Sequence, residues 1–169
     1  MIEVYVSGLA YDTLTKVPVV LLKEVEGSRV LPIWIGPNEA AVIALELSGV
    51  FPKRPLTHDL LKSVVNGFNA VLQKIVVSAL KDNTYFAKFY LQADEHSIIE
   101  IDARPSDSVA MALKMKAPIY ISNDLEDSLV EFTAPADDDS VGEDDFSDPG
   151  DLRTRLRNIS PEDFGNYNL

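Results

Sequence analysis

The stretch formed by residues 97–113 constrains the fold more than any other part of this chain, because it predicts a strand, a sharp turn and a helix. Ile98, Ile99 and Ile101 are β-branched and apolar, which is typical of a buried strand. Pro105 fixes its own φ and disfavours helical geometry in the residue before it. We therefore expect the strand to end before this proline and the helix to begin at it.

Polar side chains gather at this predicted corner, where Asp102, Arg104, Ser106 and Asp107 lie within six residues. Open α/β sheets bind ligands where a strand ends and a helix begins. Asp102 and Asp107 would suit a divalent metal, and Arg104 would suit a phosphate. Alternatively, Arg104 pairs with one of the two aspartates and only pins the corner. The sequence leaves both interpretations open.

The remaining pattern predicts one α+β domain with a mixed, mostly antiparallel sheet, packed helices and one parallel β-α-β crossover. The expected strands cover residues 2–9, 17–22, 30–35, 71–79, 84–91 and 119–122, and a hairpin turn falls at 24–28. The first expected helix starts at Gly36–Pro37, covers residues 38–47 and stops near Gly49. The others are a segment capped by Thr57 that ends at Asn66–Gly67, and residues 105–116. Exposed strand edges make a homo-oligomer plausible.

Charged residues on the first two predicted helices are further candidates for a site. Glu39 and Glu46 are seven apart and share a helix face, where they either bind a metal or form a solvated edge. His58 stands beside Asp59 at the start of the next helix. This pair either performs acid–base catalysis or belongs to the helix cap.

Aromatic residues of the predicted strand 84–91 offer a different kind of contact. Phe86 and Tyr90 share one face with Lys88, whereas Tyr85 and Phe89 share the other. Such rings stack on bases in sheet-based RNA-binding proteins. They also serve as ordinary core and cross-strand packing, which is the more frequent use.

Composition narrows the range of partners. The net charge is −12, and residues 137–151 hold eight acidic residues and no basic one. Without that segment 19 acidic residues face 15 basic ones, a net charge of −4, so no basic footprint for nucleic acid is evident. We expect residues 1–133 to form the domain, 134–151 to be an acidic flexible segment and 152–169 to be a short helix and tail.

Several classes of site are absent from the sequence. The chain has no cysteine, so thiolate chemistry and disulfides are excluded. It has no glycine-rich phosphate loop, no zinc-protease motif and no Gly-x-Ser-x-Gly elbow. No signal peptide or membrane-spanning run is recognisable, and a cytoplasmic location is the expectation. Carboxylate, histidine and arginine chemistry remains, which suits metal-assisted phosphodiester hydrolysis.

Three segments, in this order, resemble the bifunctional nuclease (BFN domain) family: residues 31–40 (LPIWIGPNEA), 54–60 (RPLTHDL) and 101–113 (IDARPSDSVAMAL). The resemblance covers roughly residues 1–130 and implies cleavage of both DNA and RNA. From the chemistry we assign His58, Asp59, Asp102, Arg104 and Asp107 to catalysis. Asp102, Asp107, Glu39 and Glu46 are the candidate ligands of Mg²⁺ or Mn²⁺. The alternatives are a non-enzymatic regulatory module that holds an anion or a protein at this corner, and an assembly protein that works through its acidic segment.

Overall fold

A single mixed sheet organises the part of the chain that the computed structural model describes, which is residues 1–12, 14–94 and 97–131. Its strands are β1 (Ile2–Tyr11), β2 (Pro18–Glu24), β3 (Arg29–Trp34), β4 (Val71–Lys81), β5 (Thr84–Gln92), β6 (Ile98–Ala103), β7 (Ile119–Ile121) and β8 (Val130–Glu131). Their spatial order is β6-β5-β4-β7-β1-β2-β3-β8, and only the β4–β7 pair is parallel. The predicted α+β class with a mostly antiparallel sheet is confirmed.

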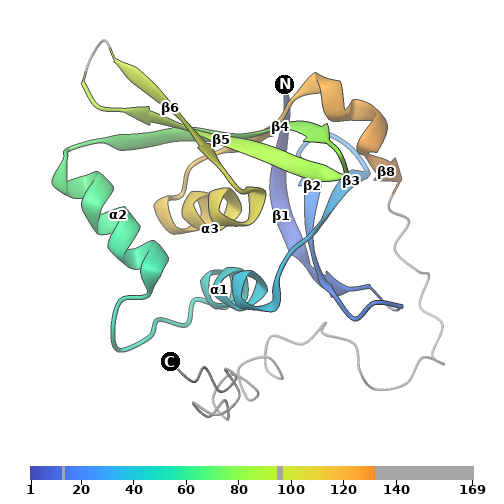
Figure 1. The fold of residues 1–169 in the computed structure, drawn as a ribbon, viewed down its shortest axis with the longest axis horizontal. Coiled ribbons are helices and arrows are strands. Elements are labelled where there is room, and N and C mark those ends of the chain that lie inside the picture. Colours follow the sequence, from blue (N-terminus) through green and yellow to red (C-terminus); the bar gives the residue numbers. More distant parts are fainter. Residues whose placement is uncertain (13, 95–96, 132–169) are drawn as a thin grey trace. The chain divides into compact units, whose positions relative to one another are not determined.

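Three α-helices and one 3-10 helix accompany the sheet in the described residues: α1 (Pro37–Ser48), α2 (Thr57–Gly67), α3 (Pro105–Met115) and η1 (Asn123–Ser128). The α-helices lie on the same side of strands β4, β5 and β6 (Figure 1). Both α1 and α3 begin with proline at the first helical position, as predicted. At the end of α1, Gly49 adopts φ 65°, a left-handed conformation that glycine reaches without strain.

The core lies between the sheet and the helices. Its largest fully buried side chains come from β2, β3, α1, β4, α3 and β7 and are Leu22, Leu31, Ile43, Ile75, Met111 and Ile121. The helix α3 contributes small residues, Ala110 and Ala112, that allow it to approach β4 and β5 closely. Strand β5 follows the predicted alternation, since Ala87, Phe89 and Leu91 are buried on the helix side.

Strand β6 is not the buried strand that its isoleucines suggest. Ile98, Ile99 and Ile101 are 65%, 47% and 39% exposed. The reason is topological, because β6 is the last strand of the sheet and pairs with β5 alone. The helix α3 packs on β4 and β5 and leaves the edge strand uncovered.

The predicted parallel β-α-β crossover is present as β6-α3-β7, which joins strands of the same direction. Strands β5 and β4 lie between β6 and β7, so the parallel partner of β7 is β4. Another local prediction needs correction. Thr57 is the first residue of α2 and not its cap. The carboxylate of Asp59 accepts a hydrogen bond from the backbone N–H of Leu56 at 2.8 Å and supplies the cap instead.

Some predicted segments lie outside the described residues: His96, the acidic segment 134–151 and the tail 152–169. The sequence analysis missed η1 and the two-residue strand β8, both of which follow β7. The short sequence Asn123–Ser128 has no helical periodicity that would reveal a single 3-10 turn. In the described residues, no helix has the length and apolar character needed to cross a membrane.

Candidate functional site

The charged candidates meet where α3 packs against α1 and α2. Glu39 and Glu46 on α1 are seven residues apart, as are Asp107 and Lys114 on α3. Seven residues make about two turns, so each helix presents its pair of charges on one face. The result is two clusters of ion pairs between the helices, one near the start of α3 and one near its end.

Arg104 is the centre of the first cluster, at the position just before α3. Its Nε donates to Asp107 Oδ2 at 2.7 Å, and its Nη2 donates to Asp107 Oδ1 at 3.2 Å. Its Nη1 donates to Glu39 Oε1 at 3.0 Å. Each Nη carries a second hydrogen, so two N–H donors remain after these contacts. The two carboxylates fix the guanidinium in place. Because the side chain of Arg104 is 66% exposed, one edge of the guanidinium faces solvent.

His58 joins this cluster from α2. Its Nε2 lies 3.1 Å from Asp107 Oδ1, so Asp107 is shared between the imidazole and Arg104. The other ring nitrogen, Nδ1, is buried and is the unpartnered side-chain polar atom found among the described residues. In this arrangement Nδ1 is thus buried and Nε2 is in contact with Asp107. The sequence pairs His58 with the adjacent Asp59, whereas the structure pairs it with Asp107.

Lys114 is the centre of the second cluster. Its side chain is only 7% exposed, and its Nζ contacts Asp59 Oδ1 at 2.5 Å and Glu46 Oε1. Asp59 has a second function, because its other oxygen caps α2 at Leu56. A single buried ammonium group therefore joins α1 and α2 to α3.

The electrostatics of both clusters favour the charged forms. Burial tends to raise the pKa of Asp107, but hydrogen bonds from Arg104 and His58 outweigh it, and the pKa lies below its ordinary value. Hydrogen bonds from Lys114 and from the Leu56 backbone lower the pKa of Asp59. Burial tends to lower the pKa of Lys114, but its two carboxylate partners raise it above the ordinary value.

The structure brings six of the seven predicted site residues into these two clusters: Glu39, Glu46, His58, Asp59, Arg104 and Asp107. Asp102 is the exception. Asp102 lies opposite Lys88 in the register of strands β5 and β6, and it is exposed. Successive residues of a strand point to opposite faces, so Asp102 lies on the face away from the helices and from Asp107.

The predicted metal ligands are divided in the same way. Arg104 lies between the carboxylates of Glu39 and Asp107. Lys114 likewise lies between the carboxylates of Glu46 and Asp59, so in both places a protein cation occupies the position that a metal ion would need. In the described residues, no three His, Cys, Asp or Glu side chains converge closely enough to hold a metal ion. The donor set as it stands does not fit a bound Mg²⁺ or Mn²⁺ ion, which requires several oxygen ligands around one point.

Lys114 and Lys62 were missed as members of the site. The seven-residue spacing of Lys114 from Asp107, which mirrors that of Glu39 and Glu46, is the signal that would reveal Lys114. Lys62 donates from its Nζ to the backbone oxygen of Lys114 at 3.1 Å, and no spacing in the sequence indicates this contact.

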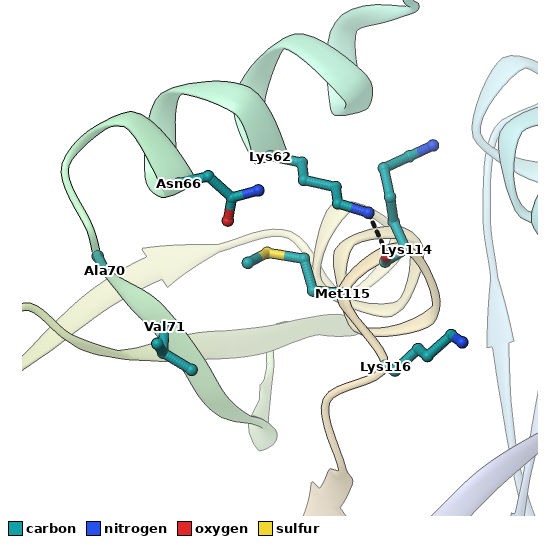
Figure 2. A pocket seen from close by; sticks show the side chains of 7 residues that line it. All are labelled: Lys62, Asn66, Ala70, Val71, Lys114, Met115 and Lys116. Atoms are coloured by element: carbon teal, nitrogen blue, oxygen red, sulfur yellow. Dashed lines mark hydrogen bonds between the residues drawn. The ribbon is translucent and has the colours of Figure 1, made fainter.

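A pocket opens beside the second cluster, lined by Lys62, Asn66, Ala70, Val71, Lys114, Met115 and Lys116. Figure 2 shows Lys62 reaching across to α3, while the amino groups of Lys114 and Lys116 point away from Asn66. The pocket therefore does not concentrate three ammonium groups on one point, and its lysines do not form an additional anion site.

Comparison with known proteins covers the part of the chain that holds these two clusters. The family model described as the bifunctional nuclease domain matches residues 20–131, which include α1, α2 and α3. An uncharacterized protein of Mycobacterium tuberculosis (strain ATCC 25618 / H37Rv) is 36% identical over 96% of this chain and 97% of its own length. Bifunctional nuclease 2 of Arabidopsis thaliana is 26% identical over 63% of this chain and 33% of its own length. Bifunctional nuclease 1 of Oryza sativa subsp. indica is 23% identical over 61% and 32%. The chain belongs to the bifunctional nuclease domain family.

Proposed function

We propose that this protein is a nuclease that hydrolyses phosphodiester bonds of DNA and RNA, with the cluster around Arg104 as its active site. Membership of the family and the names of its plant relatives support the reaction class. The exposed guanidinium of Arg104, held by Glu39 and Asp107 with two donors unused, supports the location.

Arg104 would bind the phosphate that is cleaved. A planar guanidinium with free N–H groups can donate to two phosphoryl oxygens at once. Charge accumulates on these oxygens as water attacks phosphorus and the leaving oxygen departs, so a fixed cation stabilises the transition state more than the ground state. Asp107 and Glu39 hold this cation in place before the substrate arrives.

His58 would be a positioning residue in this arrangement. It contacts Asp107, which in turn orients Arg104. The sequence suggests an acid–base role for His58 and Asp59. This role requires two changes: the imidazole of His58 turns away from Asp107, and the carboxylate of Asp59 leaves Lys114.

Metal assistance by Mg²⁺ or Mn²⁺ is a separate proposal. Glu39 and Asp107 would serve a divalent cation only if Arg104 moved aside, because the guanidinium now lies between them. No step is therefore assigned to a metal. An activity that survives EDTA would mean that Arg104 and its carboxylates suffice without one.

A non-enzymatic binding module is the second candidate function, and the neutralised cations favour it. Arg104 faces two carboxylates and Lys114 faces two more, so the described site carries no excess positive charge. A protein of net charge −12 also repels nucleic acid at long range. In this case the same corner would hold an anion or a protein partner without cleaving it.

The test of the proposed function is incubation of the full-length protein with end-labelled single-stranded DNA and RNA in Mg²⁺, Mn²⁺ or EDTA. The nuclease proposal predicts shortened products that depend on protein concentration and that an Arg104→Ala preparation, purified in parallel, does not generate. Binding of the oligonucleotide without any product would favour the second candidate.

We further propose that the protein is a homo-oligomer and that it is cytoplasmic. The uncovered edge strand β6 supports the proposed oligomer.

A further inference from the structure

We propose that the face of the sheet opposite the α-helices binds single-stranded nucleic acid, with bases on Tyr90 and Tyr120 and a phosphate on Lys74. The inference rests on the proposed function and adds to it a binding surface for the strand on the side of the sheet opposite the Arg104 cluster. Its test measures binding and not cleavage, so the two proposals fail separately.

The register of the sheet brings these three residues together. Tyr90 on β5 pairs directly with Lys74 on β4. Tyr120 on β7 pairs with Val76, the next residue of β4 on the same face. The Nζ of Lys74 lies 4.9 Å from the centre of the Tyr90 ring and 5.8 Å from that of Tyr120. An ammonium group thus lies between two aromatic rings from different strands.

Among the described residues, several cations near the sheet are neutralised by carboxylates, whereas Lys74, like Lys23 and Lys81, is not. Arg29, Lys88, Arg104 and Lys114 each contact a carboxylate, whereas Lys74 forms none of the ion pairs found in the described residues. Its contacts are the two ring faces. A cation without a carboxylate partner can bind a phosphate of the strand, and the aromatic rings beside it can stack on the neighbouring bases.

Tyrosine and lysine side chains also occur on this face at β1 and β2. Tyr5 is 46% exposed and pairs with Lys23, so a third tyrosine and a second lysine lie on this side. The acidic residues of the face are Glu3, Glu100 and Asp102, and Lys88 neutralises Glu100. In the described residues the three α-helices lie on the other side of β4, β5 and β6 (Figure 1), and Tyr90 and Tyr120 are half-buried on this face. Stacking on rings requires unpaired bases, so the partner is single-stranded.

The experiment is fluorescence anisotropy of a labelled single-stranded oligonucleotide of mixed sequence, titrated with full-length protein in EDTA. Each of Tyr90→Ala and Tyr120→Ala should weaken binding by about 5- to 100-fold, as loss of one stacked base does. Tyr90→Phe and Tyr120→Phe keep the ring and should bind like the wild type. Lys74→Met keeps the aliphatic chain over the rings but removes the charge, and should lower the salt dependence by about one phosphate contact.

Matched controls are available on other parts of the chain. Tyr11→Ala removes a tyrosine at the end of β1 that is 47% exposed, and Lys16→Gln removes an exposed lysine in the β1–β2 turn. Both should bind like the wild type, because neither residue lies beside Lys74 in the sheet. Circular dichroism establishes that every variant is folded.

Three outcomes would overturn the inference. One is wild-type protein that does not bind single strands, whether or not it cleaves them. The second is equal affinity of the wild type and the folded Tyr90→Ala, Tyr120→Ala and Lys74→Met variants. The third is a change of oligomeric state in these variants, measured by light scattering, without a change in affinity per subunit. That result would assign the face to a second copy of the chain.

Discussion

Lys114 shows how much one buried side chain contributes to the helical layer. Its Nζ contacts Asp59 on α2 and Glu46 on α1 while its backbone oxygen accepts a hydrogen bond from Lys62. Removing one partner of a buried ion pair leaves the remaining charges unpaired in a region of low polarity. Because two carboxylates depend on this ammonium group, the effect of its loss exceeds that of an exposed pair.

We predict that Lys114→Met lowers the free energy of unfolding by about 3–5 kcal/mol, the usual cost of breaking a buried ion pair. The measurement is urea denaturation followed by circular dichroism. A triple variant, Lys114→Met with Glu46→Gln and Asp59→Asn, removes all three charges and should recover part of the loss. A loss below about 1 kcal/mol for Lys114→Met would mean that the cluster is solvated, contrary to its low exposure.

The pH dependence of stability follows from the same groups. The folded pKa values of Asp59 and Asp107 lie below their ordinary values, so the folded state binds fewer protons in acid than the unfolded state. Their contribution is present above the unfolded pKa near 4 and is lost as the pH falls through the folded pKa. The folded pKa of Lys114 is raised, so its contribution disappears only in strong alkali.

We therefore predict that the melting temperature falls between about pH 5 and pH 2 and that Asp107→Asn and Asp59→Asn flatten this fall. Differential scanning calorimetry over a pH series measures it. Asp102→Asn is the matched control, since its carboxylate is exposed on β6. A wild-type melting temperature that does not change over this range would contradict the assigned ion pairs.

At the scale of single elements, the sequence predicts helices and strands well where capping and alternation are local. Pro37, Gly49 and Pro105 bound α1 and the start of α3 as expected. The error at β6 has a global cause, since three isoleucines are typical of either a buried strand or an apolar edge. Only the order of strands in the sheet decides between them, and that order depends on pairings distant in the sequence.

The same distinction applies to the site. The sequence identifies the corner around Arg104 and both candidates on α2, because these residues are neighbours in the chain. It does not reveal that Asp107, rather than Asp59, contacts His58, because that contact spans 49 residues. Asp102 is separated from Asp107 by strand alternation, whose direction is fixed only when β6 pairs with β5.

The exposed isoleucines of β6 lead to a prediction about assembly. An uncovered edge strand with apolar side chains is a template for pairing with another chain. If the homo-oligomer forms through this edge, the double variant Ile99→Lys/Ile101→Lys should be monomeric in light scattering coupled to gel filtration. Leu14→Lys changes a leucine between β1 and β2 that is 92% exposed, and it should not alter the assembly. An unchanged oligomer in the β6 variant would place the interface elsewhere.

At the scale of the whole molecule, net charge sets a limit on affinity for nucleic acid. The chain carries −12, and eight of its acidic residues fall in 137–151, outside the described residues. Long-range repulsion from this segment opposes the approach of a polyanion. The family match covers residues 20–131 and does not include this segment.

Deletion of residues 137–151 should therefore increase the affinity for a single-stranded oligonucleotide, with the largest increase at low salt, where repulsion is least screened. The net charge of the deletion variant is −4. Replacing the segment by an uncharged Gly/Ser linker of equal length separates charge from length. Unchanged affinity at every salt concentration would mean that the segment lies too far from the binding surface to influence it.

Cleavage of phosphodiester bonds is proposed to take place at Arg104. We would first measure the rate of cleavage of a labelled single-stranded oligonucleotide by the wild type, Arg104→Ala and Asp102→Asn, each verified to be folded. Loss of a group that stabilises the charged transition state should lower the rate by about 100-fold or more in Arg104→Ala. Asp102→Asn should not lower the rate, because Asp102 lies on the other face of the sheet from Arg104 and removing its negative charge does not oppose the binding of a polyanion. Equal cleavage by the wild type and folded Arg104→Ala would place the cleavage site elsewhere.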